Sequence, residues 1–266
     1  MITFSIVTAT YNRLDKLKYL YKNLLNQKKK NQFKIEWVII VEKKDIKTIS
    51  FLKRIKNLNY SIVINKTPGS FSNLIRQGIL NSKGDYVIIV GDDDGFYPKA
   101  LQIVHLRIKS NKYPEILIGY GNYINKKRKK IRLLVTKLKK LILDTNSRLL
   151  LSFVNYYMCP CVCIKKKILE NIKFFPSNYS NINDYITWLQ IRKRYKPVIV
   201  KKEIAYVGFE PGTISYSFNI EKYIFLWKIY LTSKNYFYLF PIKLLFSVIL
   251  IIINYTYRSF NFFSSK

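Results

Sequence analysis

The chain has 266 residues, of which 49% are hydrophobic, so it can bury a large core and is not a mainly disordered protein. Its 47 lysines and arginines outnumber 15 acidic residues and give a formal net charge of +32. A surface this basic attracts polyanions, such as nucleotide phosphates, anionic lipid head groups, lipid-linked phosphates or nucleic acid.

Strands and helices alternate through roughly the first 110 residues. Short apolar runs predict strands at residues 2–8, 36–41, 60–64 and 86–90. Apolar residues at helical spacing predict helices at residues 14–25, 46–58, 71–81 and 98–110. The repeated β-α-β order predicts a parallel sheet with right-handed crossovers. Strands that are apolar throughout indicate that helices cover both faces of this sheet.

Polar side chains follow three of the predicted strands, at Tyr11-Asn12, at residues 42–45 and at Asp92-Asp93-Asp94. In open parallel sheets, ligands bind beyond the carboxyl ends of the strands. The sequence therefore predicts a ligand site where these three loops meet.

The three adjacent aspartates are unusual in a chain with only 15 acidic residues. Carboxylates this close repel one another and raise one another's pKa unless a cation balances them. Hard oxygen ligands suit Mg²⁺ or Mn²⁺, which bind one or two carboxylates together with substrate phosphates. Such a cation would neutralise charge on a departing diphosphate. The alternative is a solvated turn in which an aspartate caps the next helix.

Four segments stand in order along this half of the chain: SIVTATYNR, WVIIV, KGDYVIIVGDDD and PKAL, at residues 5–13, 37–41, 83–94 and 98–101. Together they resemble family 2 glycosyltransferases of the GT-A fold. The resemblance implies an α/β fold with a mostly parallel sheet flanked by helices, a nucleotide-diphosphate sugar donor, and a divalent metal, Mn²⁺ or Mg²⁺.

The resemblance also implies roles for individual residues. Tyr11 would stack on or flank the nucleotide base, and the backbone near Ala9 would contact the base. Asp92 and Asp94 fit the Asp-x-Asp pattern that holds metal and donor, while Asp93 and Asp94 fit the equivalent paired pattern. All three aspartates are therefore candidates for the donor site.

The sequence departs from the family after the second strand, where these enzymes commonly carry Asp-Gly-Ser-x-Asp. Here the residues are Glu42-Lys43-Lys44-Asp45, so Glu42 or Asp45 would take the contact with base or ribose. The base stays open, with a UDP-type donor favoured. Arg76 lies near an Asn position of the related helix, and either assists the phosphates or is a solvated helix charge.

The second half is expected to bind the acceptor and to supply the catalytic base. Asp184 begins an apolar helical pattern, where family members carry a Glu-Asp pair that here is Asn183-Asp184. The resemblance makes Asp184 the general base of a direct displacement, which would invert the anomeric configuration. An acid in the first turn also stabilises a helix, which is the alternative role. Glu210, in a later loop, is a further candidate for contacting metal or phosphate.

Cys159, Cys161 and Cys163 alternate along a predicted strand at residues 158–164, which would place their thiols on one face. An odd, clustered set is no disulfide framework and favours a reducing compartment. A structural zinc site normally needs four ligands, so we expect buried thiols rather than zinc. The acid-free run at residues 125–143 is either a solvated basic face or a patch for anionic lipid or a diphosphate-linked acceptor.

The tail is rich in aromatic and aliphatic residues, and its apolar run at residues 244–253 would cover about 15 Å as a helix. That is half of a bilayer core of about 30 Å, so an interfacial helix is favoured over a span. The alternative is a helix packed on the catalytic domain or on a second subunit.

We therefore expect three regions: a nucleotide-sugar-binding half at residues 1–110, an acceptor-binding half at 111–215 and a membrane-associating or packing tail at 216–266. The expected function is transfer of a hexose to a glycan or lipid-linked acceptor in surface-polysaccharide or lipid-linked glycan assembly. Without a basic signal segment at its start, the chain is expected in the cytoplasm, peripheral at the inner face of the membrane. The alternative is a non-catalytic scaffold or a polyanion-binding protein at an anionic membrane.

Two other classes fit the sequence less well. A nucleic-acid-binding protein has no use for the acidic triplet, so nucleic acid is not an expected partner. A nucleotidyltransferase would carry a glycine-rich phosphate loop near its start, and residues 9–14 contain no glycine.

Overall fold

The computed structural model describes residues 1–28, 32–65, 71–125, 127, 129–172 and 183–209, and the single positions 241 and 245. The chain divides into two compact units, Met1–Ser215 and Tyr216–Lys266, and every helix and strand named below belongs to the first. Glu210 and, apart from Leu245, the apolar run at residues 244–253 lie outside the described residues, so their roles stay predictions.

The first half of the sheet has the β-α-β order that the sequence predicts. Its strands are β1 (Ile2–Thr10), β2 (Phe33–Glu42), β3 (Asn59–Asn65) and β4 (Tyr86–Ile89). They pair in parallel in the order β3-β2-β1-β4. The helices between and after them are α1 (Leu14–Gln27), α2 (Ile46–Leu52), α3 (Phe71–Asn81) and α4 (Ala100–Ser110). The predicted helix at residues 46–58 is too long, because the chain turns after Leu52 and Asn57 adopts a left-handed φ of 65°.

Strands β1, β2 and β4 of this half are buried on both faces, whereas the edge strand β3 is mostly half-buried. Phe4 and Ile6 of β1 lie in one core with the leucines of α1 and the apolar side of α4. Val7 and Ile40 point the other way, toward α3, where a Cβ atom at Gly78 would come within 2.5 Å of both side chains. Gly78 therefore lets α3 lie close to the sheet, and the continuous apolar strands are explained by burial on both sides.

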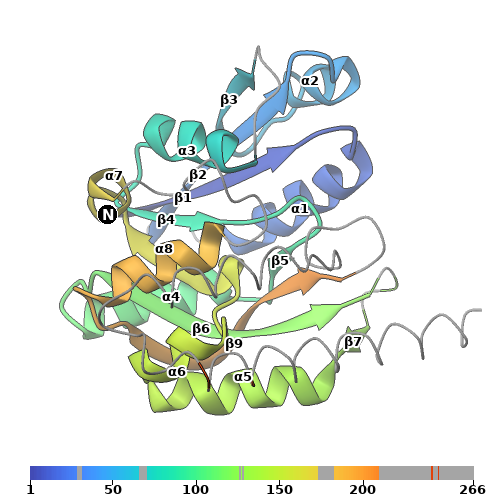
Figure 1. Ribbon diagram of the computed structural model, residues 1–266. Coiled ribbons are helices and arrows are strands. Elements are labelled where there is room, and N and C mark those ends of the chain that lie inside the picture. The colour runs from blue at the N-terminus through green and yellow to red at the C-terminus, as the bar shows by residue number, and fades with distance from the viewer. Residues whose placement is uncertain are drawn as a thin grey trace, which may run out of the picture. The chain divides into compact units, whose positions relative to one another are not determined.

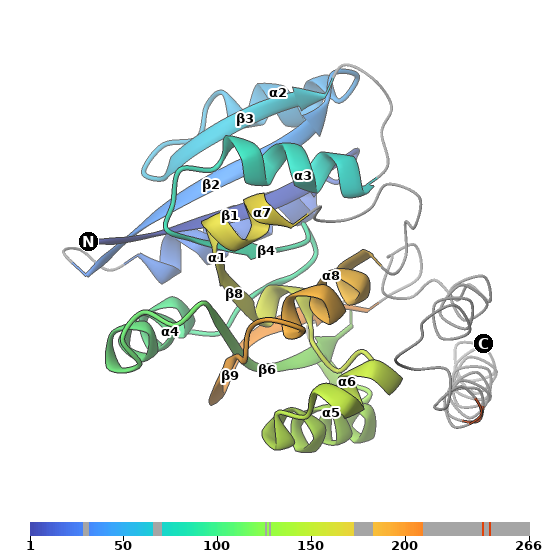
Figure 2. The same cartoon turned by 60° about the vertical axis from the view of Figure 1, so that its left-hand side comes forward.

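The second half extends the sheet with mixed pairing. Its strands are β5 (Gly95–Phe96), β6 (Ile116–Ile124), β7 (Lys130–Ile131), β8 (Val162–Lys165) and β9 (Val198–Gly208). Strand β8 pairs antiparallel with both β4 and β6, β9 runs parallel to β6, and the path through the sheet is β3-β2-β1-β4-β8-β6-β9-β5. The helices are α5 (Leu133–Thr145), α6 (Arg148–Phe153), α7 (Lys166–Asn171) and α8 (Asn183–Arg192). Figures 1 and 2 show α3, α7 and α8 on the same face of the sheet.

The cysteine segment differs from its prediction. Cys159–Cys161 forms a turn of 3₁₀ helix, closed by the Cys161 N–H donating to the Met158 carbonyl at 2.8 Å, and the strand begins only at Val162. Pro160 has no N–H to donate to a ladder and fixes its own φ, so it interrupts the predicted strand. All three thiols are free; Cys161 and Cys163 are buried and Cys159 is half-buried.

Candidate active site

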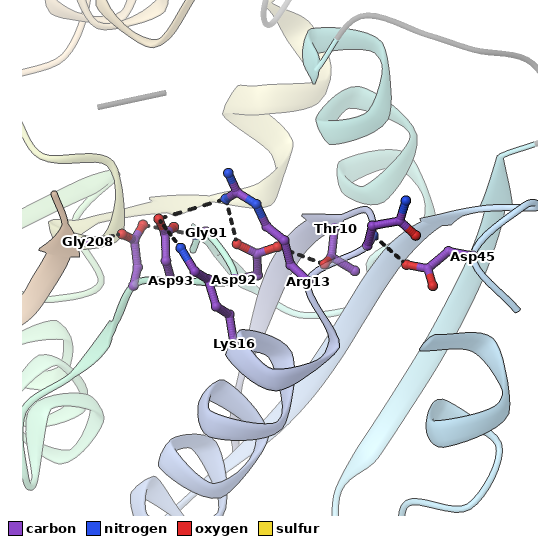
Figure 3. Close-up of polar contacts among 10 residues, drawn as sticks. Thr10, Arg13, Lys16, Asp45, Gly91, Asp92, Asp93 and Gly208 are labelled. Carbon is purple, nitrogen blue, oxygen red and sulfur yellow. Dashed lines mark hydrogen bonds and ion pairs between the residues drawn. The ribbon is translucent and has the colours of Figure 1, made fainter. Parts of the chain in front are cut away.

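The loop that follows β1 lies at the carboxyl edge of the sheet and is tied to the start of α2. Tyr11 is 46% exposed, and Asn12 takes a left-handed φ of 53°. The Asn12 N–H donates to Asp45 Oδ2 at 2.7 Å, while the Thr48 N–H donates to Asp45 Oδ1 at 3.2 Å. Asp45 is therefore the N-cap of α2 and also fixes the loop that presents Tyr11 (Figure 3).

Asp45 and Glu42, the two candidates for the contact with base or ribose, have different surroundings. Both carboxylate oxygens of Asp45 already accept backbone N–H groups, and the side chain is buried. Glu42, at the end of β2, is half-buried and forms no hydrogen bond or ion pair with any side chain that the structure describes. The Glu42 carboxylate is thus the one available to a ligand. The Asp45 carboxylate instead holds the Tyr11 loop and the start of α2 in place.

The first two aspartates of the triplet are held by groups at the end of β1 and the start of α1. The Thr10 hydroxyl donates to Asp92 Oδ2 at 2.8 Å, and Arg13 Nη1 donates to Asp92 Oδ1 at 3.2 Å. Arg13 Nη1 and Lys16 Nζ lie 3.9 and 3.8 Å from Asp93 Oδ2 (Figure 3). Burial raises the pKa of Asp92, and the Thr10 and Arg13 contacts oppose that rise.

Asp94 is held differently, by backbone alone. The Gly91 N–H donates to its Oδ2 at 2.9 Å, and the Gly208 N–H, at the end of β9, donates to its Oδ1 at 3.0 Å. Asp94 is 7% exposed and forms no ion pair with a described residue. Burial, with the charge of Asp93, raises its pKa to about 8. A Cβ atom at position 208 would lie 2.9 Å from Asp93, so a glycine is required for β9 to approach the triplet this closely.

The triplet fits a divalent cation in charge and in donor type. Asp94 is a buried carboxylate without a cationic partner in the described part of the chain, so a cation would remove an electrostatic cost. Among the described residues, however, no three His, Cys, Asp or Glu side chains gather into a metal site. Mg²⁺ and Mn²⁺ accept one or two carboxylates plus substrate phosphates, so the aspartates would suffice once a diphosphate is present.

Asp184 comes from the second half of the chain. It sits half-buried in the first turn of α8, where Asn155 Nδ2 donates to its Oδ2 at 3.3 Å. Burial raises the pKa of the Cys159 thiol well above its ordinary value, and the charges of Asp184 and Asp94 raise it further. Two carboxylates from opposite halves of the sequence therefore act electrostatically on one thiol.

The remaining sequence candidates are placed as follows. Ala9 is half-buried near the end of β1, beside Ile40 of β2. Arg76 is exposed on α3. The sequence analysis missed Thr10 and Arg13. Both could have been predicted, because they flank Tyr11-Asn12 in a loop that was expected to lie next to the triplet.

The comparison with protein families decides the identity. Residues 5–173, more than half of the chain, match the family described as glycosyl transferase family 2. The chain belongs to this family. The segments that carry the resemblance in the sequence therefore mark true membership, and the chain is a glycosyltransferase by family.

Solved structures show the same fold. TarS 1–349 of S. aureus, in complex with UDP-GlcNAc, is 17% identical with a TM-score of 0.64, over 88% of this chain and 68% of that one. Longer TarS gives a TM-score of 0.60 at 16% identity, over 88% of this chain and only 40% of that one. The mannosyltransferase PcManGT of Pyrobaculum calidifontis, in complex with GDP-Man and Mn²⁺, gives 0.55 at 12% identity, over 79% and 58%. A comparison with curated protein sequences gives no match.

These likenesses confirm the expected GT-A fold class, a mixed α/β sheet flanked by helices. Family and fold together support a nucleotide-sugar glycosyltransferase. At these identities the structural likeness carries the fold alone, and the roles of single residues are argued below from this chain.

Proposed function

We propose that the protein transfers a sugar from a nucleoside diphosphate donor to an acceptor hydroxyl, with inversion at the anomeric carbon. The observation that carries this proposal is the buried Asp94 carboxylate, held by the Gly91 and Gly208 N–H groups beside two further aspartates, in a chain of glycosyl transferase family 2. An inverting transfer needs a general base on one side of the sugar and a charge-stabilising group at the leaving diphosphate on the other.

The donor would bind across the ends of β1, β2 and β4. The exposed ring of Tyr11 stacks on the base, the backbone at Ala9 contacts the base, and Glu42 accepts from base or ribose. Asp45 contributes by holding the Tyr11 loop. UDP-GlcNAc with TarS and GDP-Man with the mannosyltransferase both support a nucleoside diphosphate sugar, and we favour a uridine nucleotide.

The diphosphate would lie against the acidic triplet. Asp94 and Asp92 are the proposed metal-holding residues, and Asp93 lies between them on the donor side. Mn²⁺ or Mg²⁺, when bound there, supplies positive charge against the leaving diphosphate. The Mn²⁺ complex of the mannosyltransferase supports the choice of a divalent cation.

The chemical step is a single displacement. The Asp184 carboxylate accepts the proton of the acceptor hydroxyl while that oxygen forms a bond to the anomeric carbon. The bond between the anomeric carbon and the diphosphate oxygen breaks on the opposite face, and the electron pair leaves with the diphosphate. Asn155, which donates to Asp184 Oδ2, keeps that carboxylate oriented toward the acceptor. The first 110 residues would thus bind the donor, and residues 111–215 the acceptor, a glycan or a lipid-linked glycan.

The test is titration calorimetry with UDP, GDP and TDP, each with and without Mn²⁺, on the wild type and on Asp94→Asn. One diphosphate should bind in the presence of metal, and Asp94→Asn should lose that binding. A protein that binds none of the three with metal present, under conditions where it is folded, would contradict the donor assignment. Transfer from the matching nucleotide sugar, with the product configuration read by NMR, then tests inversion.

A further inference from the structure

Helix α5 carries most of its leucines on its solvent side. Leu134, Leu138 and Leu141 are 71%, 50% and 64% exposed and follow one another at i, i+4 and i+7, so they form one stripe. Leu133 at the start of the helix and Leu149 on the neighbouring α6 are also more than half exposed. We call these five side chains the leucine face. Figures 1 and 2 show α5 on the outer side of β6 and β9.

Four lysines and arginines at residues 130–140 make contacts within the fold. Lys130 and Lys140 pair with Glu203 at 2.8 and 2.7 Å. The Arg132 guanidinium lies 4.5 Å from the Phe209 ring centre, and Lys139 Nζ donates to the Tyr123 hydroxyl at 3.0 Å. The predicted basic patch at residues 125–143 is therefore not a uniformly basic surface on α5. It is an apolar stripe with cations at its border.

Two exposed cations lie beside these leucines in the sequence. Lys137 is exposed between Leu134 and Leu138, and Arg148 is exposed beside Leu149. The one acid of α5, Asp144, accepts from the Tyr120 hydroxyl at 2.6 Å and has Lys201 Nζ 3.9 Å away, which offsets its charge. The leucine face is thus mainly apolar, with exposed cations next to its leucines.

We propose that the leucine face docks on the surface of an anionic lipid bilayer, with α5 lying in the interface plane. An exposed helix with leucines outward and cations beside them has the composition of an interfacial helix. The stripe lies on a convex helix surface, which lipid head groups can accommodate without a preformed groove. No helix in the described part of the chain is long and apolar enough to cross a membrane, so any attachment through these residues is peripheral.

Charge favours a lipid surface over the other occupants. A second copy of a chain with a net charge of +32 is repelled by the first, whereas an anionic bilayer attracts both. Nucleic acid offers phosphates but no apolar surface for a row of leucines. This docking does not depend on the donor chemistry proposed above; it would place the enzyme where lipid-linked acceptors reside.

The test is cosedimentation of the full chain with vesicles of phosphatidylcholine alone or mixed with phosphatidylglycerol. The triple variant Leu134→Ser, Leu138→Ser, Leu141→Ser should bind the mixed vesicles at least about tenfold more weakly than the wild type. The matched control is Leu80→Ser with Leu106→Ser, two leucines that are both 58% exposed, on α3 and α4, and it should bind as the wild type does. Lys137→Gln should weaken binding by about fivefold, and only for vesicles that contain phosphatidylglycerol.

A second readout locates the contact. Tryptophan introduced as Leu138→Trp should be quenched by brominated lipid in the mixed vesicles, whereas Leu106→Trp should not. The proposal is overturned if the wild type does not bind the anionic vesicles, or if the triple variant binds them unchanged. It is also overturned if the wild type forms a dimer that the triple variant abolishes. Calorimetry of the nucleoside diphosphate without vesicles should give the same affinity for the wild type and the triple variant, so a failure of donor binding would be seen separately.

Discussion

The carboxylates of Asp92 and Asp94, which follow β4, each accept two hydrogen bonds, and one donor to Asp94 is the Gly208 N–H at the end of β9 in the other half. Asp184, at the start of α8, accepts from the Tyr185 N–H at 2.7 Å and from Asn155 Nδ2 at 3.3 Å. The triplet thus follows a parallel strand of the sheet, whereas the proposed base lies in the first turn of a helix.

This difference assigns separate tasks to the two halves. Groups that stabilise developing charge contribute most when they are held in place before the reaction. A base must instead meet an acceptor that arrives separately, and only its position relative to one hydroxyl matters. Damage to the donor side should therefore reduce both binding and catalysis, and damage at Asp184 should reduce catalysis alone.

The largest expected effect is that of Asp184→Asn. An amide cannot take the acceptor proton, so kcat should fall by about 10²- to 10⁴-fold. Affinity for the nucleoside diphosphate, measured by calorimetry, should stay at the wild-type value. Asn155→Ala should reduce kcat less, because the carboxylate is kept and only its orientation is lost. Loss of diphosphate binding in Asp184→Asn would show that the two halves do not act separately.

Asp94→Asn should lower kcat/KM by about 10²- to 10³-fold, because it removes charge where the diphosphate departs. In contrast to Asp184→Asn, it should also abolish the metal dependence of diphosphate binding. Asp15→Asn is the matched control, since the Asp15 side chain is fully exposed on α1 and has no proposed part in donor binding. Equal diphosphate affinity for Asp94→Asn and the wild type at saturating Mn²⁺ would remove Asp94 from the metal site.

The sequence predicted the donor half better than the acceptor half, for a physical reason. Strand ends and the acidic triplet follow from local apolar runs and from the rule that ligands bind beyond parallel strands. Two element bounds were predicted wrongly: Pro160 interrupts a predicted strand, and Asn57 lies in a turn inside a predicted helix. In both places the prediction followed the apolar pattern and not the local turn-forming residue. The ion pairs of Lys130 and Lys140 with Glu203 were not predictable, because Glu203 lies on a strand far along the chain.

Substitutions of Glu42 and Asp45 should have smaller effects on donor kinetics and stability. Glu42→Gln should raise the donor KM by about tenfold without lowering the melting temperature, because the Glu42 carboxylate supports no described contact. Asp45→Ala should destabilise the protein by about 1 kcal/mol, because α2 loses its N-cap. Thermal unfolding and donor kinetics on both variants separate the two roles. If Glu42→Gln were the destabilised variant, the assignment of the structural role to Asp45 would be wrong.

The smallest effect concerns Glu203, a carboxylate of the acceptor half that is paired with cations and proposed to have no catalytic role. Burial raises its pKa, but hydrogen bonds from Lys130 and Lys140 outweigh burial and lower the pKa to about 2. A carboxyl group with a lowered pKa in the folded state stabilises the protein above its unfolded pKa of 4.5, and this contribution is lost as the pH falls toward 2.

Glu203→Gln should therefore reduce the free energy of unfolding by about 1 kcal/mol at neutral pH, a modest value because the pair is partly exposed to solvent. Urea unfolding of the variant and the wild type should converge as the pH is lowered from 4.5 toward about 2. Glu170→Gln, which removes an exposed pair with Lys166 on α7, should cost less at neutral pH. The kcat of Glu203→Gln should equal that of the wild type, since the pair holds α5 and β7 against β9 and lies apart from Asp184. A fall in kcat with unchanged stability would instead place Glu203 in the acceptor site and end the distinction between its role and that of Asp184.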